Sequence, residues 1–363
     1  MLKTSPAVFA VGNDYQIMFE VEKESLVSVK VDDKIYYDES NGIMNSLSSL
    51  HRVTVPMEKL NNAKKYTVCV RPLIERKPYF TETEEPTELT YDFTPVPQKN
   101  IRTYHLADTH NRIDEPVLAA KAFGKMDFLI LNGDILDHSD DPTKFENIYI
   151  ICAKLTNGNI PVVFSRGNHD LRGNFAEKFA DYTPSQNRNT YYTFRLGSLW
   201  GILLDCGEDK DDSCSSYGFT VACHTFRERE TKFLKSVIAN NKSEYNAKGV
   251  ETRIVIAHNP FTEYLPAPFD IEKDIYTEWA KLLAENVKPN VMICGHIHKS
   301  YICYPKVNED YIARPCPVVV GSEPSDEKFI GCGFVFGQDS IEVIFTDSDG
   351  NTLSTEIIKK TNY

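Results

Sequence analysis

The chain has 363 residues, a length that favours two domains. Its composition, 41% hydrophobic and 25% charged, is ordinary for globular proteins and excludes a disordered chain. The net charge of -12 argues against nucleic-acid binding, but phosphate chemistry stays open, because bound metal ions can supply positive charge. No run of about 18 apolar residues is present, so we expect no membrane span.

Residues 8–93 carry the alternation of β-branched and aromatic residues that is typical of strands. The predicted strands are 8–22, 26–37, 52–55, 66–71 and 88–93, with turn-forming Gly, Asn and Asp between or within them. Because no helical pattern interrupts them, we expect a β-sandwich. Segment 60–70 resembles the tyrosine-corner strand of a fibronectin type III domain, in which the hydroxyl of Tyr66 would bond to backbone near an upstream leucine. A plain cross-strand contact of Tyr66 is the alternative.

A proline-containing connector, Thr94-Pro95-Val96-Pro97-Gln98, ends this region, since proline fixes φ and restricts the residue before it. We therefore expect domains at 1–95 and 96–363. Beyond the connector, short apolar strands alternate with helical patterns, and after Pro317 only strand patterns remain. The predicted strands are 102–107, 128–131, 162–164, 199–205, 253–257, 291–294, 318–321, 333–336 and 341–345, and the predicted helices are 116–125, 144–155, 227–240 and 274–285. This order predicts an α/β domain that ends in a run of strands.

Residue types that bind metals or transfer protons gather just after predicted strands. They are Asp108, His110, Asp134, Asn168, His169, His258, His296 and His298. In open α/β sheets, the carboxyl ends of the strands present ligands and catalytic groups. The pairs Asp108/His110 and His296/His298 are two positions apart, so each pair faces one way. Such a set supplies the nitrogen and oxygen ligands that two divalent metal ions need.

Five motifs contain these residues. In chain order they are Asp108-x-His110, Gly133-Asp134-x-x-Asp137, Gly167-Asn168-His169-Asp170, His258 and Gly295-His296-x-His298. Their types and order resemble the calcineurin-like metallophosphoesterase superfamily, and the resemblance covers the catalytic part of the chain. It implies an α/β (α+β) fold, namely a calcineurin-like four-layer αββα sandwich, preceded here by the fibronectin III-like β-sandwich.

The resemblance also implies roles for these residues. One metal ion would be held by Asp108, His110 and His298, the other by Asn168, His258 and His296, with Asp134 bridging the pair. His169 would be the general acid, and Asp137 would orient it. The reaction would be in-line attack on a phosphoric ester by a hydroxide that bridges the two ions. Mn²⁺, Fe and Zn²⁺ are all compatible with these ligands.

Differences from the motifs of individual subfamilies narrow the range of possible substrates. A β-sandwich before such a domain resembles the purple acid phosphatases, but those have a tyrosine ligand where this chain has Asp137, so we expect no purple ferric centre. Serine/threonine protein phosphatases have Arg-Gly after the second aspartate, where this chain has His138-Ser139. Arg166, directly before Gly167, resembles an arginine that holds substrate phosphate in those enzymes. We expect Arg166 to favour phosphomonoesters; an arginine paired with an acid is the alternative.

Three functions therefore stay open. They are a phosphomonoesterase, a phosphodiesterase that acts on substrates such as cyclic nucleotides, and a non-catalytic scaffold with a vestigial metal site. For either enzyme, we expect a small-molecule phosphoester as substrate. Segments 206–224 and 264–270 are candidates for specificity loops or lids, or are inert connections.

Nine cysteines, none of them in a C-x-x-C pair, favour free thiols in a reducing compartment. The N-terminus also lacks the apolar core of a signal peptide, so we expect a cytoplasmic protein. Cys206, Cys214 and Cys223 beside His224 could instead hold a zinc ion, and ordinary loop and core cysteines are the other interpretation of these positions.

Overall fold

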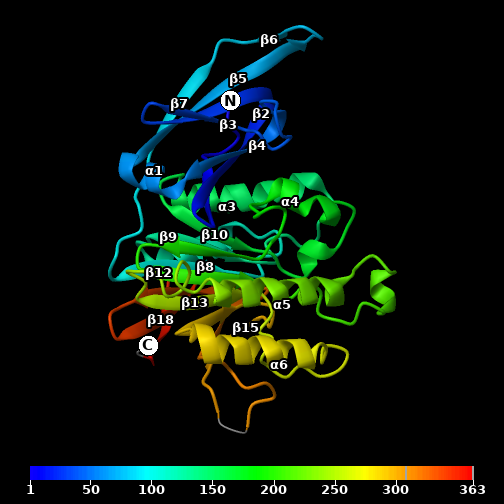
Figure 1. Cartoon of the computed structure of the whole chain (residues 1–363), viewed down its shortest axis with the longest axis vertical. Coiled ribbons are helices and arrows are strands. Elements are labelled where there is room, and N and C mark those ends of the chain that lie inside the picture. Colours follow the sequence, from blue (N-terminus) through cyan, green and yellow to red (C-terminus); the bar gives the residue numbers. More distant parts are fainter. Residues whose placement is uncertain (307–308, 362–363) are drawn as a thin grey trace.

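The structure is a computed structural model that describes residues 1–306 and 309–361. A sheet-rich N-terminal region stands at one end of the molecule, and an α/β part with two sheets fills the rest (Figure 1). No helix within the described ranges is long and apolar enough to cross a membrane.

The first sheet of the α/β part has a parallel centre and an antiparallel edge. Its strands, in order across the sheet, are β10 (Pro161–Ser165), β9 (Phe128–Asn132), β8 (Ile101–Leu106), β17 (Phe329–Phe336), β18 (Ser340–Asp347) and β19 (Thr352–Lys359). The three parallel strands are β8, β9 and β10. Their carboxyl ends therefore open onto one edge of the sheet.

The second sheet is also mostly parallel. Its order is β11 (Tyr192–Leu196), β12 (Leu199–Leu204), β13 (Thr252–Ala257), β14 (Val291–Cys294), β16 (Val318–Pro324) and β15 (Lys299–Cys303). The end of β16 pairs with β17 and so joins the two sheets.

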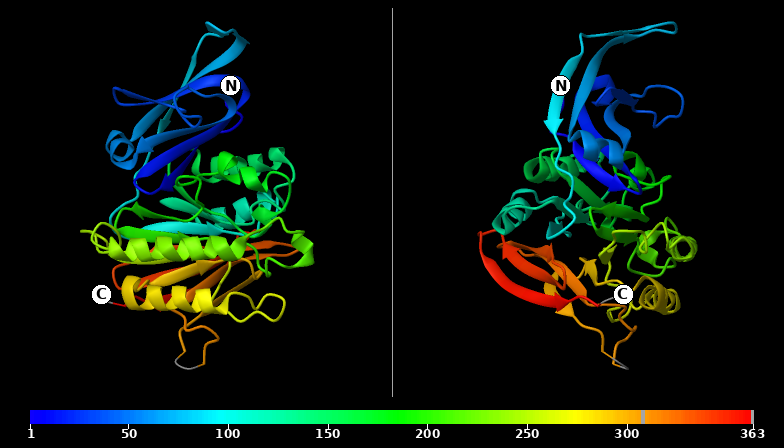
Figure 2. Two further views of the ribbon diagram at one scale, coloured as in Figure 1. Left: turned by 45° about the vertical axis from the view of Figure 1, so that its right-hand side comes forward. Right: turned by 60° about the vertical axis from the view of Figure 1, so that its left-hand side comes forward.

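Helices cover the outer face of each sheet. Contacts place α2 (Asp114–Phe123) and α3 (Glu146–Thr156) on the first sheet. On the second sheet, α5 (Cys223–Ala239) and α6 (Lys273–Leu282) lie side by side (Figure 2), and a π-helical turn, η5 (Leu283–Val287), extends α6. The remaining short helices are η1 (Pro142–Phe145), η2 (His169–Leu171), η3 (Ala176–Lys178), α4 (Phe179–Tyr182) and η4 (Ser215–Tyr217).

The period-two alternation of the strands explains the layers. On β12, Leu199 and Leu203 belong to the core that the first sheet shares, whereas Trp200 and Leu204 belong to a separate core beneath α5 and α6. Both faces of this strand are therefore buried, one against the first sheet and the other against the helices. The four-layer αββα arrangement confirms the predicted fold class.

The N-terminal region consists of seven strands and one helix. They are β1 (Ala7–Val11), β2 (Asp14–Val31), β3 (Lys34–Tyr37), β4 (Leu47–Pro56), α1 (Met57–Ala63), β5 (Lys65–Arg76), β6 (Thr81–Thr83) and β7 (Thr87–Asp92). The expectation that this region contains no helix was wrong. Pro56 precedes α1 with a φ of -56°, and Lys64 ends it in the left-handed conformation. Proline suits this position because its missing N–H would have had no partner in the first turn.

Strand β1 connects the N-terminal region with the first sheet. It pairs antiparallel with β2 on one side and parallel with β10 on the other, so β10 is not an edge strand. Hydrogen bonds also join the two parts: Gln16 Nε2 donates to the Ser185 carbonyl (2.7 Å), and an Arg52 Nη donates to the Thr183 carbonyl (2.6 Å). These contacts cross the expected division between 1–95 and 96–363.

Tyr66 takes part in this connection instead of forming a tyrosine corner. Its hydroxyl donates to the carbonyl oxygen of Gly158, 3.0 Å away in the α/β part, and not to backbone near an upstream leucine. The tyrosine-corner prediction was therefore wrong. The cross-strand alternative describes the ring, which stacks on Tyr91 of β7 at a centroid distance of 5.3 Å.

Candidate metal centre

The predicted metal ligands lie where strands of both sheets end. Asp108 follows β8, Asp134 follows β9 and Asn168 follows β10, whereas His258 and His296 follow β13 and β14. Parallel pairing aligns the ends of neighbouring strands, and side chains from the two sheets come together there. His110 and His298 come two residues after Asp108 and His296, and complete the set of seven.

The backbone at these strand ends is strained. Five of the seven residues have a left-handed conformation: Asp108 (φ 53°), His110 (45°), Asp134 (50°), His296 (71°) and His298 (55°). Such a conformation costs a non-glycine residue about 1–3 kcal/mol and tends to occur at functional sites.

The glycine that precedes Asn168 is required by close packing. A Cβ atom on Gly167 would lie 2.1 Å from Oδ1 of Asp134, so no other residue fits there without moving this carboxylate. This contact explains why a glycine precedes asparagine in the third motif.

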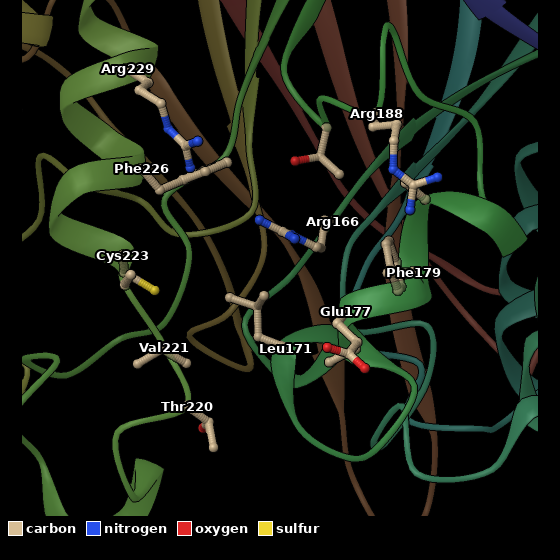
Figure 3. A pocket seen from close by; sticks show the side chains of 14 residues that line it. Arg166, Leu171, Glu177, Phe179, Arg188, Thr220, Val221, Cys223, Phe226 and Arg229 are labelled. Atoms are coloured by element: carbon tan, nitrogen blue, oxygen red, sulfur yellow. The ribbon is translucent and has the colours of Figure 1, made fainter.

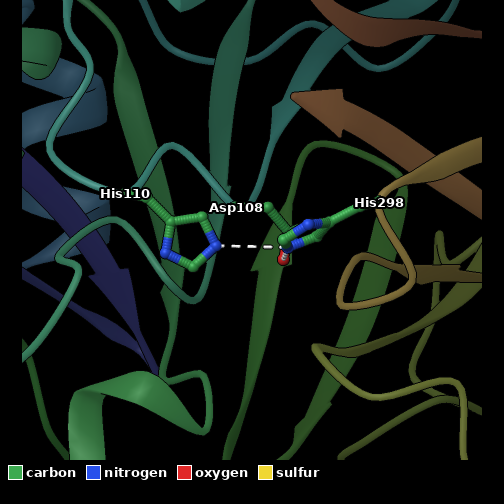
Figure 4. A group of neighbouring side chains, drawn as sticks. All are labelled: Asp108, His110 and His298. Carbon is green, nitrogen blue, oxygen red and sulfur yellow. Dashed lines mark hydrogen bonds and ion pairs between the residues drawn. The ribbon is translucent and has the colours of Figure 1, made fainter. Parts of the chain in front are cut away.

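Asp108, His110 and His298 form one compact group (Figure 4). His298 Nε2 lies 3.5 Å from Asp108 Oδ1 and 3.2 Å from His110 Nε2. The Asp108 carboxylate is fully buried and accepts hydrogen bonds from the backbone N–H of His296 (2.9 and 3.0 Å). Two imidazole nitrogens and a carboxylate that face one another form a donor set that a divalent cation satisfies.

Asp134, His258 and His296 form the second group. His258 Nε2 lies 3.1 Å from Asp134 Oδ2, and the Asn168 amide lies 3.0 Å from His296 Nδ1. His258 Nδ1 donates to the carbonyl of Asn132 (2.6 Å), so its Nε2 faces the other ligands. This arrangement is typical of metal-binding histidines, whose second nitrogen is held by a backbone or carboxylate oxygen.

Asp134 belongs to the second group, and its charge also acts on His110 of the first. Burial opposes its ionisation, but His258 outweighs burial and holds the pKa of Asp134 below its ordinary value. Burial would lower the pKa of His258, yet Asp134 and Asp108 raise it to about 10. Burial and His258 together lower the pKa of His296 to about 4. Buried carboxylates therefore demand a positive charge here, which fits a cation site.

His169 and Asp137 are also brought together, but by a different contact from the expected one. His169 Nδ1 donates to the backbone carbonyl of Asp137 (2.9 Å), whereas the Asp137 carboxylate is 3.9 Å from the same nitrogen. The carboxylate lies nearer to His138 (3.2 Å) and His110 (3.6 Å). The side chain of His169 is 25% exposed, so its ring can meet a substrate.

Arg172 is a site residue that the sequence did not reveal. One of its Nη atoms lies 2.9 Å from His169 Nε2, and its Nε and other Nη donate to the buried Glu208 carboxylate (2.8 and 3.0 Å). The contact depends on the 3₁₀ turn η2, which starts at His169 and brings residues three apart onto one side.

Arg166 does not contact the predicted ligands. Its Nε lies 2.8 Å from Oδ2 of the buried Asp205, and its guanidinium group covers the Phe226 ring. These contacts agree with the alternative, in which Arg166 pairs with an acid. Its phosphate-binding role remains a prediction.

Segment 206–224 is anchored at the edge of the metal centre. Glu208 and Asp209 are buried, and the Tyr217 hydroxyl lies 3.0 Å from each carboxylate. Asp209 Oδ2 in turn lies 3.9 Å from His296 Nε2. Residues 265, 269 and 270, from the second candidate loop, line a small pocket beside Asp209.

The alternative cysteine site is not assembled. Across the described ranges, no group of side chains close enough to share an ion includes a cysteine. Instead, Cys206 Sγ lies 3.8 Å from the carbonyl of Asn259, Cys223 Sγ accepts from the Glu208 N–H, and His224 pairs with Glu272.

Comparisons with known proteins agree with this geometry. The model of the calcineurin-like phosphoesterase family matches residues 101–300, which include all seven predicted ligands. The structure of a purple acid phosphatase from yellow lupin seeds is similar in fold (TM-score 0.60, 13% identity), and the match covers 98% of this chain and 74% of that chain.

A dimetal phosphatase from Danio rerio is also similar (TM-score 0.50, 11% identity), covering 72% of this chain and all of that one. A search among curated proteins gave no match. The chain is a hydrolase of phosphoric esters and belongs to the calcineurin-like phosphoesterase family.

Proposed function

We propose that this enzyme hydrolyses phosphomonoesters of small molecules with the help of two metal ions. The observation that carries the proposal is that metal-ligand side chains from both sheets converge beside a partly exposed imidazole, His169, and a guanidinium fork, Arg172. The proposed ligands are Asp108, His110 and His298 for one ion, and Asn168, His258 and His296 for the other, with Asp134 between them.

Two bound metal ions supply an activated water and neutralise charge on the phosphoryl oxygens. The donor set contains imidazole nitrogens and carboxylate and amide oxygens, without thiolate, and this supports Mn²⁺, Fe or Zn²⁺ as the ions. The buried carboxylates of Asp108 and Asp134 attract those cations.

His169 is the proposed general acid. Because Nδ1 is held by the carbonyl of Asp137, the nitrogen that can deliver a proton to the leaving oxygen is Nε2. When Nε2 carries a proton, Arg172 no longer donates to it but stays fixed through its two bonds to Glu208.

Arg172 is the proposed phosphate ligand of the site. Glu208 holds the guanidinium plane, and a fork of this kind matches two oxygens of a terminal phosphate. A phosphomonoester has three free phosphoryl oxygens and a diester only two, so only a monoester keeps one for the metal ions when the fork binds two. The sequence predicts the same role for Arg166, and only the position of Arg166 before the third motif supports that prediction.

The test compares hydrolysis of nitrophenyl phosphate with that of bis-nitrophenyl phosphate after Mn²⁺ loading, with Asn168→Ala as inactive control. We expect a monoester preference that Arg172→Lys reduces, and a further reduction in Arg166→Lys would support the role predicted for Arg166. A diester preference in the wild-type enzyme would instead support a phosphodiesterase, with cyclic nucleotides as the next substrates.

Metal analysis addresses the scaffold alternative separately. We expect about two metal ions per chain, and a loss of metal in Asp134→Ala. A chain that takes up no metal under loading conditions would be a scaffold with a vestigial site.

We also propose a cytoplasmic location and a domain division at 1–95 and 96–363. All nine cysteines are free, which supports a reducing compartment. The connector Thr94–Gln98 supports this division. The pairing of β1 with β10 means that the two domains share a sheet.

A further inference from the structure

A second cavity lies beside the metal centre and has a different chemistry. It has a volume of about 310 Å³ and lies between the start of α5, the loop at 220–222 and the segment 171–180 (Figure 3). None of the seven proposed metal ligands lines it, nor does His169. The two sites share the η2 turn, because His169 begins this turn at the metal centre and Leu171 ends it in the wall of the cavity.

The cavity has an excess of positive charge. Three arginines line it, Arg166, Arg188 and Arg229, against one acid, Glu177. Figure 3 shows the three guanidinium groups around the same space. Arg188 pairs with Asp181 at the surface (2.6 Å), whereas no ion pair of Arg229 occurs among the described residues. Asp205 likewise pairs with Arg166, so Arg229 is the guanidinium group whose charge a bound anion would balance.

One of these arginines is held in place before any ligand binds. The side chain of Arg166 is only 12% exposed, and its Nε lies 2.8 Å from the carboxylate of Asp205, as an ion pair. Its guanidinium lies 5.2 Å from the centroid of the Phe226 ring, and that of Arg229 lies 5.7 Å from the same centroid. A fixed cation at the base of a cavity gives up little conformational freedom when it meets an anion.

The remaining walls are apolar. They include Leu171, Phe179, Val221 and Phe226. Binding sites for small molecules typically combine such walls with a few placed polar groups, in cavities of roughly 300–1,000 Å³. The apolar walls and the arginines together require a ligand that has both an apolar body and a negative charge.

We infer that this cavity is a second binding site, separate from the metal centre, for a small organic anion with an aromatic or apolar body. Arg166 meets the anionic group from within, Arg229 and Arg188 meet it from the rim, and the body of the ligand packs against Phe226 and Leu171.

The probe for this site is 1-naphthalenesulfonate, which has an aromatic body and a permanent negative charge and has no phosphoester bond to hydrolyse. Its binding to the full-length protein is measured by isothermal titration calorimetry. Arg229→Gln is the test variant, and Lys232→Gln is the matched control, because Lys232 is an exposed cation on the same helix but outside the cavity.

We expect saturable binding that Arg229→Gln weakens about fivefold and Lys232→Gln leaves unchanged. Phe226→Leu, which removes the ring but keeps an apolar residue, should also weaken binding. Equal affinities of the Arg229→Gln and Lys232→Gln proteins, or the lack of saturable binding to wild type, would overturn the inference.

A second measurement separates this site from the metal centre. Protein stripped of metal by a chelator and then dialysed should bind the probe with unchanged affinity, since none of the proposed ligands lines the cavity. If stripping abolished binding, the probe would be held by the metal ions and the inference would fail. Neither measurement depends on catalytic activity, so the result stands apart from the proposed reaction.

Discussion

At the scale of single residues, His169 gives the sharpest prediction about the reaction. Replacing it with Asn should lower kcat about 10²–10⁴-fold while the metal content stays unchanged, because the proposed proton donor is lost. The loss should be larger for an alkyl phosphate than for nitrophenyl phosphate, since nitrophenolate leaves without full protonation. Equal losses for the two substrates would show that His169 does not protonate the leaving group.

Asp137 provides a matched comparison. It holds His169 through its backbone carbonyl, which every residue has, so Asp137→Ala should lower kcat far less than His169→Asn does. If both variants lost the same activity with metal still bound, the carboxylate itself would be required for catalysis. Metal content has to be measured for both proteins, because this carboxylate also lies 3.6 Å from His110.

The buried pair Asp38–His51 predicts a pH dependence of stability in the N-terminal region. Burial would raise the pKa of Asp38, but its bonds to His51 (2.8 Å) and Ser40 lower it overall. A carboxyl with a lowered folded pKa stabilises the fold above its unfolded pKa of about 3.9, and this contribution is lost as the pH falls below that value.

Between about pH 5 and pH 2.5, the free energy of unfolding of Asp38→Asn should therefore fall less steeply than that of wild type. Chemical denaturation at a series of pH values measures this slope. Asp33→Asn, at an exposed aspartate, serves as control and should follow wild type.

The residues of the metal centre differ in how far the sequence predicts them. Asp108, His110, His296 and His298 could be predicted because their spacing and their positions after strands follow from local rules. Arg172 could not, because its role depends on a 3₁₀ turn and on Glu208, 36 residues away in the chain. The position of Arg166 directly before the third motif predicts a contact with substrate phosphate, but in the structure Arg166 pairs with Asp205.

At the scale of elements, segment 206–224 is better described as a fixed wall than as a lid. Buried Glu208 ties it to Arg172, and within the segment the Tyr217 hydroxyl bonds to both Glu208 and Asp209. If the wall positions Arg172 for substrate phosphate, Glu208→Gln and Arg172→Lys should each lower kcat/KM for a monoester about 10–100-fold.

Because the two residues act as a unit, the double variant should be little worse than either single one. Steady-state kinetics of the two single variants and the double variant complete this double-mutant cycle. Metal content and melting temperature are checked for each protein. Fully additive losses would mean that Glu208 does not act through Arg172.

The elements that the sequence missed have physical reasons. Helix α1 has only seven residues, too few for a clear apolar periodicity, and it stands between strands. Strand β15 is only partly buried at every position except exposed Lys299, so its alternation is weak. By contrast, the long, strongly patterned helices α3 and α5 were predicted to within a few residues.

At the scale of the whole molecule, the N-terminal region and the α/β part share a sheet. The pairing of Val8 and Phe9 with Pro161 and Val162 joins residues that are about 150 positions apart, which no local pattern reveals. From the sequence, the connector at 94–98 predicts two separate domains. In the structure, the pairing of β1 with β10 brings residues of both parts into one hydrophobic core. We therefore expect the full chain to unfold in a single cooperative calorimetric transition.

Tyr66→Phe tests this coupling at one bond. The variant keeps the ring that stacks on Tyr91 but removes the hydroxyl that donates to Gly158, so a buried carbonyl is left without its partner. Such a loss costs about 1–3 kcal/mol. If the two parts unfold together, the whole transition should move to lower temperature while staying single, and Tyr91→Phe, at the other ring of the stack, should move it less. A transition that splits in two, with only one part shifted, would show that the N-terminal region folds independently and that β1 merely rests against β10.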